Sequence, residues 1–296
     1  MSLSYITYLA YFLAWKILAF LPERYAYELM SWIADRITKR NPQGVQRLRS
    51  NYLRTRPDFT EPQLQAAVKE GMRSYLRYWC DTFRLPTWSN ADIVRRTTVI
   101  NDHLLREALA AGRGAIVSLP HAGNWDQAGA YYCQTGAPVV TVAEHLEPER
   151  LFVKFLAYRQ SLGMEVLDAS ARSLALLSQR LRQGRLIALV ADRDLSKSGV
   201  NVNFFDHPAR MPRGPALLSI QTGAPLLTAF VRYIETGIEI TFEPAIEIPT
   251  LGTNAEKASL MIQESADRLQ RHLKLHLTDW HMLQRIWIDG DFKEHE

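Results

Sequence analysis

The sequence predicts an α/β protein with a mostly parallel central sheet, helices on both faces, and an N-terminal helical extension at a membrane interface. Short apolar runs recur between residues 115 and 242, with helical patterns between most of them, which is typical of such a sheet. The 296 residues are 47% hydrophobic and 22% charged, which excludes disordered and collagen-like classes. Because no repeat or low-complexity linker interrupts the chain, we expect a helical extension over residues 1–100 and one continuous core over 101–296.

The N-terminal run over residues 5–21 is apolar nearly all round and stops before Pro22. It falls slightly short of the roughly 20 residues that a spanning helix needs. Trp15 and Lys16 are of the types that favour the lipid headgroup zone. We therefore expect this helix to lie in the membrane interface, with a spanning helix and a buried core helix as alternatives.

Positive charge is concentrated in the first hundred residues. Residues 1–100 hold 15 Lys and Arg against 8 Asp and Glu, whereas the whole chain has a net charge of +4. Residues 36–56 contain seven basic side chains and no acidic one. Such a stretch attracts phosphate, either of an anionic lipid or of a nucleic acid, and a merely solvated helix face is the alternative.

The remaining elements follow from the spacing of apolar residues. Buried strands are predicted at 115–119, 138–142, 165–167, 186–190, 226–231 and 238–242. Helices are predicted at 24–40, 61–85, 101–111, 149–162, 171–183, 213–222 and 254–277. Gly112 suits the cap at the C-terminal end of the third of these helices.

The string from Ser118 to Asp126 is the most informative about chemistry. It follows a predicted strand, and ligands bind at the carboxyl ends of strands in open parallel sheets. His121 could act there as a general base, with a carboxylate to fix its tautomer and stabilise the imidazolium. Gly123 lets the backbone turn tightly, and Asp126 supplies a carboxylate five positions after the histidine. The alternative is a structural role for both side chains.

Two further strings follow the predicted strands. Asp192 and Asp194 alternate with Arg193 just beyond residues 186–190, so one acid could be the partner of His121. Pairing with Arg193 or a role in a turn is the alternative. Arg210 and Arg213 stand beside a predicted helix start, where a phosphate or carboxylate could bind.

Other chemistries lack their motifs. The sequence holds no Gly-x-Ser-x-Gly elbow and no phosphate-binding loop motif. His272 and His276 could bind zinc from one helix face, but a structural role is favoured and we expect no metal. Two cysteines cannot form a disulfide framework, which favours a reducing compartment.

Taken together, these strings resemble the lipid acyltransferase family that includes lipid A lauroyl/myristoyl and phosphatidylinositol mannoside acyltransferases. Its hallmark, a histidine followed five positions later by Asp or Glu, is matched by His121 and Asp126. The similarity extends over nearly the whole chain, and the actinobacterial phosphatidylinositol mannoside branch looks closest. Its marks here are LPHAGNWDQAG, TVAEHLEPE, YRQSLGMEVL, DRDLSKSGVNVNFF, ARMPRGPALLSIQTGA and DWHMLQRIWI.

The resemblance assigns roles to particular residues. It implies that His121 is the general base and that Asp192 is the carboxylate of a histidine–carboxylate relay, a Glu in some members. Asp126 is implied to orient the loop or to bind the acceptor. Further residues are implied to line the acyl-donor cleft, the last two on weaker matches: Arg159, Ser198, Gln221, Glu144 and Arg210.

The resemblance also implies a reaction. A fatty acyl group, palmitoyl in the typical case, would pass from acyl-CoA to the 6-hydroxyl of the mannose on inositol position 2 of a phosphatidylinositol mannoside. The implied enzyme is peripheral on the cytoplasmic face of the cell membrane, uses no cofactor, and binds an anionic lipid surface rather than nucleic acid. The alternatives are an acyl-carrier-protein-dependent acyltransferase acting on lipid A or another glycolipid, and a non-enzymatic membrane or nucleic-acid binder.

Overall fold

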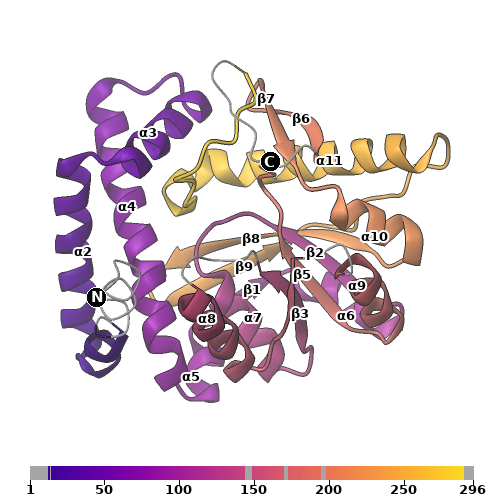
Figure 1. Cartoon of the computed structure of the whole chain (residues 1–296), viewed down its shortest axis with the longest axis horizontal. Coiled ribbons are helices and arrows are strands. Elements are labelled where there is room, and N and C mark those ends of the chain that lie inside the picture. Colours follow the sequence, from indigo (N-terminus) through magenta and orange to yellow (C-terminus); the bar gives the residue numbers. More distant parts are fainter. Residues whose placement is uncertain (1–12, 14, 144–148, 170–172, 195–197, 290–296) are drawn as a thin grey trace.

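The computed structural model describes residues 13, 15–143, 149–169, 173–194 and 198–289. These residues form a central sheet between two layers of helices, and a group of N-terminal helices stands beside the sheet (Figure 1). The predicted fold class, α/β with a mostly parallel sheet flanked by helices, is confirmed.

Seven strands make up the sheet within the described part of the chain, in the order β1-β9-β8-β2-β5-β3-β4. Neighbouring strands are parallel except β8 and β9, which are antiparallel. The strands are β1 (Thr97–Ile100), β2 (Ala115–Leu119), β3 (Val139–Ala143), β4 (Glu165–Asp168), β5 (Leu186–Val190), β8 (Leu226–Ile234) and β9 (Gly237–Phe242). Every residue of the central strand β2 is buried, as expected of a strand covered on both faces.

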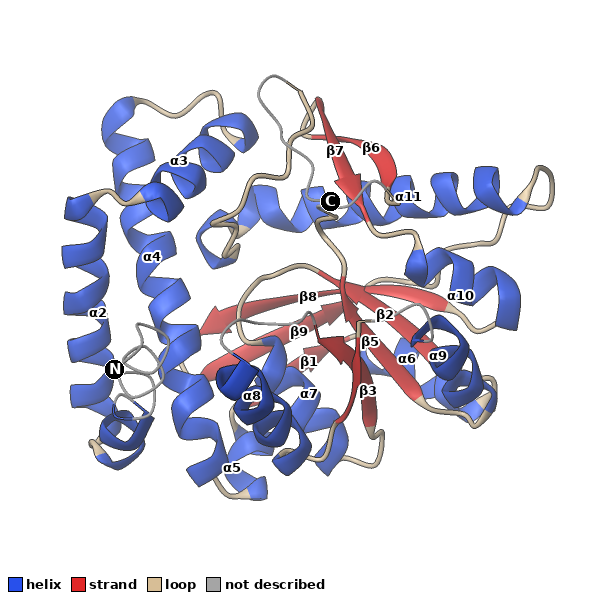
Figure 2. Ribbon diagram, in the orientation of Figure 1, coloured by secondary structure: helices blue, strands red, loops and turns tan. Residues whose placement is uncertain are grey.

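Helices cover both faces of this sheet (Figure 2). One face carries α9 (Ser173–Arg182), α10 (Gly214–Thr222) and α11 (Asn254–Leu275). The other carries α6 (Asp102–Ala110) and α7 (Trp125–Gln134), with α5 (Asn90–Arg95) against α7; α8 (Glu149–Ser161) packs beside β4. Helix α11 begins with a capping box between Thr253 and Glu256, and α10 ends at Gly223, whose φ of 70° suits a residue without a Cβ.

The N-terminal helices α2 (Glu23–Arg40) and α3 (Gln43–Thr55) both pack on α4 (Glu61–Arg84). Most of the helix expected over 5–21 lies outside the described residues, although Leu13 and residues 15–20 are helical. In the described part of the chain, no helix combines the length and apolar character that a membrane crossing requires.

The sequence did not predict helices α3 and α5 or strands β1, β6 and β7. Helix α3 occupies much of the basic stretch over residues 36–56. Strand β1 pairs with β9, although it lies within residues 1–100, where a purely helical extension was expected. Strands β6 (Val200–Phe204) and β7 (His207–Met211) form a hairpin, against which α11 packs. Phe205 and Asp206 make its two-residue turn with φ of 50° and 60°; the turn lacks the Asn-Gly pattern that identifies such turns in a sequence.

Buried side chains of α3 tie the N-terminal helices to the C-terminal segment. The Tyr52 hydroxyl donates to the Trp280 carbonyl oxygen at 3.0 Å, and the whole tyrosine is buried. Gly71 of α4 makes room for this ring, because a Cβ at residue 71 would lie 2.3 Å from the tyrosine oxygen. The glycine is therefore a packing requirement, although alanine is the better helix former.

We expect Gly71→Ala to lower the free energy of unfolding by about 1–3 kcal/mol, because the methyl group overpacks the site and displaces the Tyr52 hydroxyl. Urea unfolding followed by circular dichroism would measure this. Gly214→Ala is the matched control, since a Cβ there meets nothing within 4 Å. A higher unfolding midpoint for Gly71→Ala than for the wild type would contradict the prediction.

Candidate active site

The register of β2 and β5 brings His121 and Asp192 together. These parallel neighbours pair Leu119 with Val190 at their carboxyl ends, and the Ala191 N–H donates to the Leu119 carbonyl oxygen at 2.9 Å. Each functional residue lies two positions beyond its strand. They therefore meet at the centre of the carboxyl edge of the sheet, where open α/β folds bind ligands.

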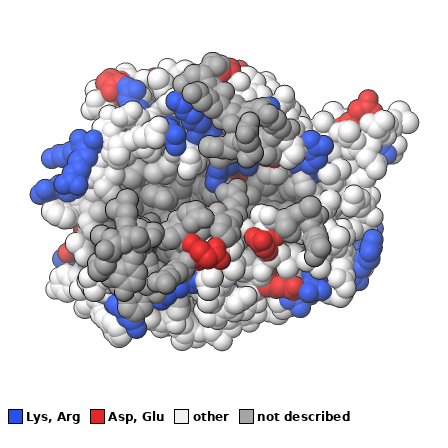
Figure 3. All heavy atoms as spheres, in the orientation of Figure 1, with Lys and Arg blue, Asp and Glu red and all other residues white. Residues whose placement is uncertain are grey.

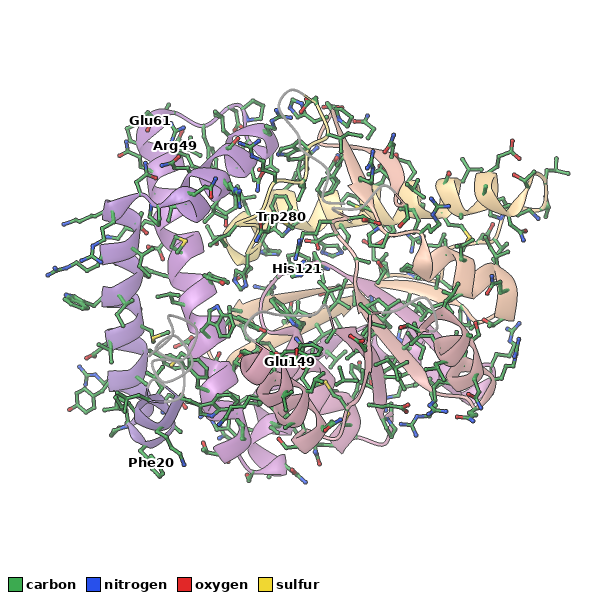
Figure 4. The ribbon with its side chains drawn as sticks, in the orientation of Figure 1. Phe20, Arg49, Glu61, His121, Glu149 and Trp280 are labelled. Carbon is green, nitrogen blue, oxygen red and sulfur yellow. The ribbon has the colours of Figure 1, made fainter. Side chains whose placement is uncertain are left out.

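The two side chains form a close pair in which the carboxylate is fully buried. The His121 Nδ1 lies 2.6 Å from Asp192 Oδ1, and the His121 backbone N–H donates to Asp192 Oδ2 at 3.0 Å. The indole N–H of Trp280 donates to the same oxygen at 2.8 Å. Figure 4 shows His121 between the sheet and the segment that carries Trp280. Three donors thus surround one carboxylate.

Electrostatics favour the ionised form of Asp192. The side chain is fully buried, and burial by itself would raise its pKa; the His121 imidazole and the N–H donors outweigh burial and lower the pKa of this carboxyl. A carboxylate on Nδ1 fixes the neutral imidazole as the Nδ1–H tautomer, which leaves Nε2 to accept a proton. The His121 side chain is 25% exposed and lines a cavity of about 580 Å³.

The cavity wall is mainly apolar and aromatic, which suits a lipid chain. Its aromatic members are Tyr75, Tyr78, Trp79, Trp125, Phe152 and Phe155. Polar groups on the same wall include Arg159, Arg193 and His281, whereas α9 and α10 contribute Leu174, Leu177 and Leu218. The cavity therefore joins a long apolar surface to a proton acceptor.

Asp126 holds other side chains rather than the histidine. Its Oδ1 accepts from Arg159 Nε at 2.8 Å, and its Oδ2 accepts from the Tyr78 hydroxyl at 3.0 Å. Burial would lower the pKa of Arg159, but Asp126 and the neighbouring tyrosines raise it, so the guanidinium stays charged. Asp126 thus fixes a cation in the cavity wall, while its predicted role in orienting the loop or binding the acceptor stays a prediction.

The loop that carries His121 is held from the other side by the C-terminal segment. The Gly123 N–H donates to the Asp279 carbonyl oxygen at 3.0 Å, and the His281 N–H donates to the His121 carbonyl oxygen at 2.8 Å. Gly123 has φ of 57°, and a Cβ there would lie 2.6 Å from the Val231 carbonyl oxygen. A glycine is therefore required at this turn.

The structure separates the other residues implied to line the donor cleft. Arg159 lines the cavity, whereas Gln221 lies on the exposed side of α10, outside the lining. Arg210 belongs to β7, where its Nε donates to Asn201 Oδ1 at 3.1 Å, and the Ser198 carbonyl oxygen accepts from Arg213. Ser198 and Arg210 also lie outside the lining. Glu144 falls outside the described residues.

Sequence reasoning missed Trp280 and His281. Burial lowers the pKa of His281 to about 3, so the ring is neutral. Its Nε2 lies 3.0 Å from Ser74 Oγ, whose proton goes to Asp279 Oδ1 at 2.8 Å. The His281 Nε2–H must therefore donate to the serine oxygen, which leaves Nδ1 as an acceptor with no hydrogen-bond partner among the described residues. The run DWHMLQRIWI is the signal that could have found both residues.

His272 Nε2 lies 3.0 Å from Glu243 Oε1, and its ring stacks on Phe230 with centroids 5.2 Å apart. These contacts describe a packed interface between α11 and the sheet. Within the described residues, no group of three or more His, Cys, Asp or Glu side chains is arranged to hold a metal ion.

We expect His281 to make stability depend on pH. Its pKa is about 3 in the folded protein against 6.5 for an exposed histidine, so the unfolded chain takes up the proton first. Above pH 6.5 the ring is neutral in both states, and the free energy of unfolding does not depend on His281 protonation. As the pH falls from 6.5 towards 3, the free energy of unfolding decreases by about 1.4 kcal/mol per pH unit.

Denaturant unfolding of the wild type and of His281→Gln between pH 7 and 4 measures this effect. The difference in unfolding free energy between them should shrink as the pH falls. His103→Gln, at an exposed position of α6, is the matched control. A difference for His281→Gln that is independent of pH would contradict the prediction.

Comparison with known proteins relates the chain to acyltransferases. Residues 1–288 match the sequence profile described as bacterial lipid A biosynthesis acyltransferase. A phosphatidylinositol mannoside acyltransferase of Mycolicibacterium smegmatis is 38% identical over 288 residues, 96% of this chain and 92% of that protein. One of Mycobacterium tuberculosis is 42% identical over 254 residues, 83% of this chain and 78% of that protein. The chain belongs to the bacterial lipid A biosynthesis acyltransferase family.

Proposed function

We propose that this acyltransferase moves a fatty acyl group, palmitoyl in the expected case, from acyl-CoA to a phosphatidylinositol mannoside. The acceptor atom is the 6-hydroxyl of the mannose on inositol position 2. The observation that carries the proposal is the His121–Asp192 pair, 2.6 Å apart, at the wall of a large apolar cavity. The names of the two mycobacterial relatives support the acceptor class.

The pair can perform the transfer by general base catalysis. His121 Nε2 takes the proton of the sugar hydroxyl while that oxygen attacks the thioester carbonyl. The buried Asp192 carboxylate stabilises the imidazolium that forms. When the tetrahedral intermediate collapses, the carbon–sulfur bond breaks, and the imidazolium proton passes to the departing thiolate. An ester and free CoA result, and the enzyme returns to its starting protonation state.

Other cavity residues support this chemistry. The Arg159 guanidinium, held by Asp126, places positive charge in the wall that the developing oxyanion faces. The neutral His281 ring also lines the cavity beside His121. The apolar part of the wall accommodates the acyl chain.

A second candidate changes the substrates but not the chemistry. It is an acyl-carrier-protein-dependent transfer to lipid A or another glycolipid, and the family description, which names lipid A biosynthesis, is the reason to test it. Mass spectrometry of the products decides between the two. Palmitoyl-CoA and palmitoyl-acyl-carrier protein are each offered with a dimannosylated phosphatidylinositol and with a lipid A precursor. A product from palmitoyl-CoA and the mannoside supports our proposal; a product from the carrier protein and lipid A alone supports the alternative.

We further propose that the enzyme is peripheral on the cytoplasmic face of the cell membrane. Phe20 is 82% exposed and Trp32 is 55% exposed, and the guanidinium of Arg36 lies 4.5 Å from the centre of the Trp32 ring. Exposed aromatic and basic side chains close together suit an anionic lipid surface.

We expect Asp192→Asn to lower kcat on the order of 10²- to 10⁴-fold, because the amide cannot fix the same tautomer or stabilise the imidazolium. His121→Ala should lower it at least as much. Asp206→Asn, in the hairpin turn, is the matched control and should keep the wild-type rate. Wild-type rates of acyl transfer by purified His121→Ala would show that His121 is not the general base and that another group takes the proton.

We expect Trp32→Ser and Phe20→Ser to weaken sedimentation with vesicles of phosphatidylglycerol and phosphatidylcholine, since each removes exposed apolar surface. Leu251→Ser is the matched control, because Leu251 is 85% exposed in the loop before α11. Equal effects of all three substitutions would argue against a membrane-binding surface that contains Phe20 and Trp32.

A further inference from the structure

A second cavity, of about 220 Å³, adjoins the reaction cavity. We call it the rim cleft; its wall includes Arg47, Ser50, Arg54, Arg285, Trp287 and Asp289. Residues 282–284 line the reaction cavity, and the chain continues directly into the rim cleft at Arg285. The two spaces share a wall, because Arg47 Nη1 donates to Gln284 Oε1 at 3.1 Å.

Among the described residues that line it, the rim cleft has three arginines and one acid, Asp289. The Asp289 Oδ1 accepts from Arg54 Nη1 at 2.6 Å. The Nε of Arg47 is buried and has no hydrogen-bond partner among the described residues. The Arg47 side chain also lines the cleft, where its positive charge attracts an anion. Figure 3 shows Lys and Arg atoms on the upper left of the face, the side on which α2 and α3 lie in Figure 1.

The start of α3 adds to this field. The helix follows Pro42, has no side-chain cap and no acid in its first turn, and contributes Gln43 and Gln46 to the cleft wall. The first N–H groups of a helix and the positive end of its dipole attract phosphate and carboxylate groups. The uncapped end therefore acts in the same direction as the arginines.

The cleft is held in shape by a buried amide. Asn51 Nδ2 donates to the carbonyl oxygens of Met282 and Gln284, each at 2.8 Å, and Asn51 Oδ1 accepts from the Trp287 indole at 2.9 Å. The guanidinium of Arg54 lies 5.4 Å from the centre of the Trp287 ring. These contacts fix the C-terminal segment against α3, so the arginines stand on a rigid frame rather than on a loose surface.

We propose that the rim cleft is a phosphate subsite for a substrate whose reactive end lies at His121. Arginine forks match the oxygens of phosphate groups, and a substrate that extends past residues 282–285 reaches both spaces. Which phosphate binds rests on the proposed function: acyl-CoA carries phosphates on its nucleotide, and the acceptor lipid carries a phosphodiester. The shared chemistry is a phosphate group next to the reaction cavity.

Binding without turnover tests the subsite directly. Calorimetry on the full chain measures the affinity for adenosine 3′,5′-bisphosphate and for inorganic pyrophosphate. The double substitution Arg47→Gln/Arg285→Gln should weaken binding about 10- to 100-fold, through the loss of charge-assisted hydrogen bonds. Arg49→Gln is the matched control, because Arg49 pairs with Glu61 at 2.6 Å and lies away from His121 in Figure 4.

A second variant separates charge from folding. Gln46→Glu places a negative charge in the cleft wall, while an acid in the first turn favours the helix itself. We expect weaker phosphate binding with an unfolding midpoint at or above that of the wild type. Wild-type affinity in both Gln46→Glu and the double variant would overturn the subsite.

Kinetics identify the source of the phosphate. If the donor binds there, the double substitution raises KM for palmitoyl-CoA about tenfold or more but leaves KM for palmitoyl-pantetheine, which lacks the phosphates, unchanged. If the acceptor binds there, KM for the mannoside rises instead. Either result supports the subsite, and identical KM values in the double variant and Arg49→Gln count against it. Phosphate binding without acyl transfer would instead refute the proposed function alone.

Discussion

A buried negative charge is the constraint on which the site depends. Asp192 is fully enclosed, and a carboxylate in such a place is tolerated when donors surround it. The donors are the His121 ring, the His121 backbone N–H and the Trp280 indole. They come from the loop after β2 and from the C-terminal segment, so the carboxylate brings distant parts of the chain together while it prepares the imidazole to accept a proton.

The C-terminal segment then becomes the link between the catalytic edge and the N-terminal helices. Asn51 and Tyr52, both buried in α3, bind backbone oxygens of that segment. The same segment supplies Trp280 to the carboxylate and its backbone to the His121 loop. A disturbance of α3 therefore reaches the active site through these hydrogen bonds. The basic wall of the rim cleft belongs to this same frame.

The sequence was sufficient for the parts of the molecule that depend on local pattern. Apolar runs located β2 and β5, and two residues just past such runs had to meet at one edge of a parallel sheet. Trp280 could not be found in this way, because its contact with Asp192 joins residues that are 88 positions apart. Helix α3 was also missed, since most of its residues are polar and only Val45, Leu48, Tyr52 and Leu53 are large apolar side chains. Gln221 matched a family pattern, but the turn of α10 carries it to the exposed side.

The backbone around residue 192 explains why its side chain is an aspartate and not the longer glutamate. Both partners lie two residues beyond strands that end in register, so the backbones of the two loops run close together. The proof of this proximity is that Asp192 accepts from the main chain of His121 as well as from its ring. A short side chain can make both bonds at once, with one oxygen for each. A glutamate at this position would add a methylene to a fully buried space and push its oxygens past the backbone N–H. The shorter acid is therefore matched to this spacing of strand ends.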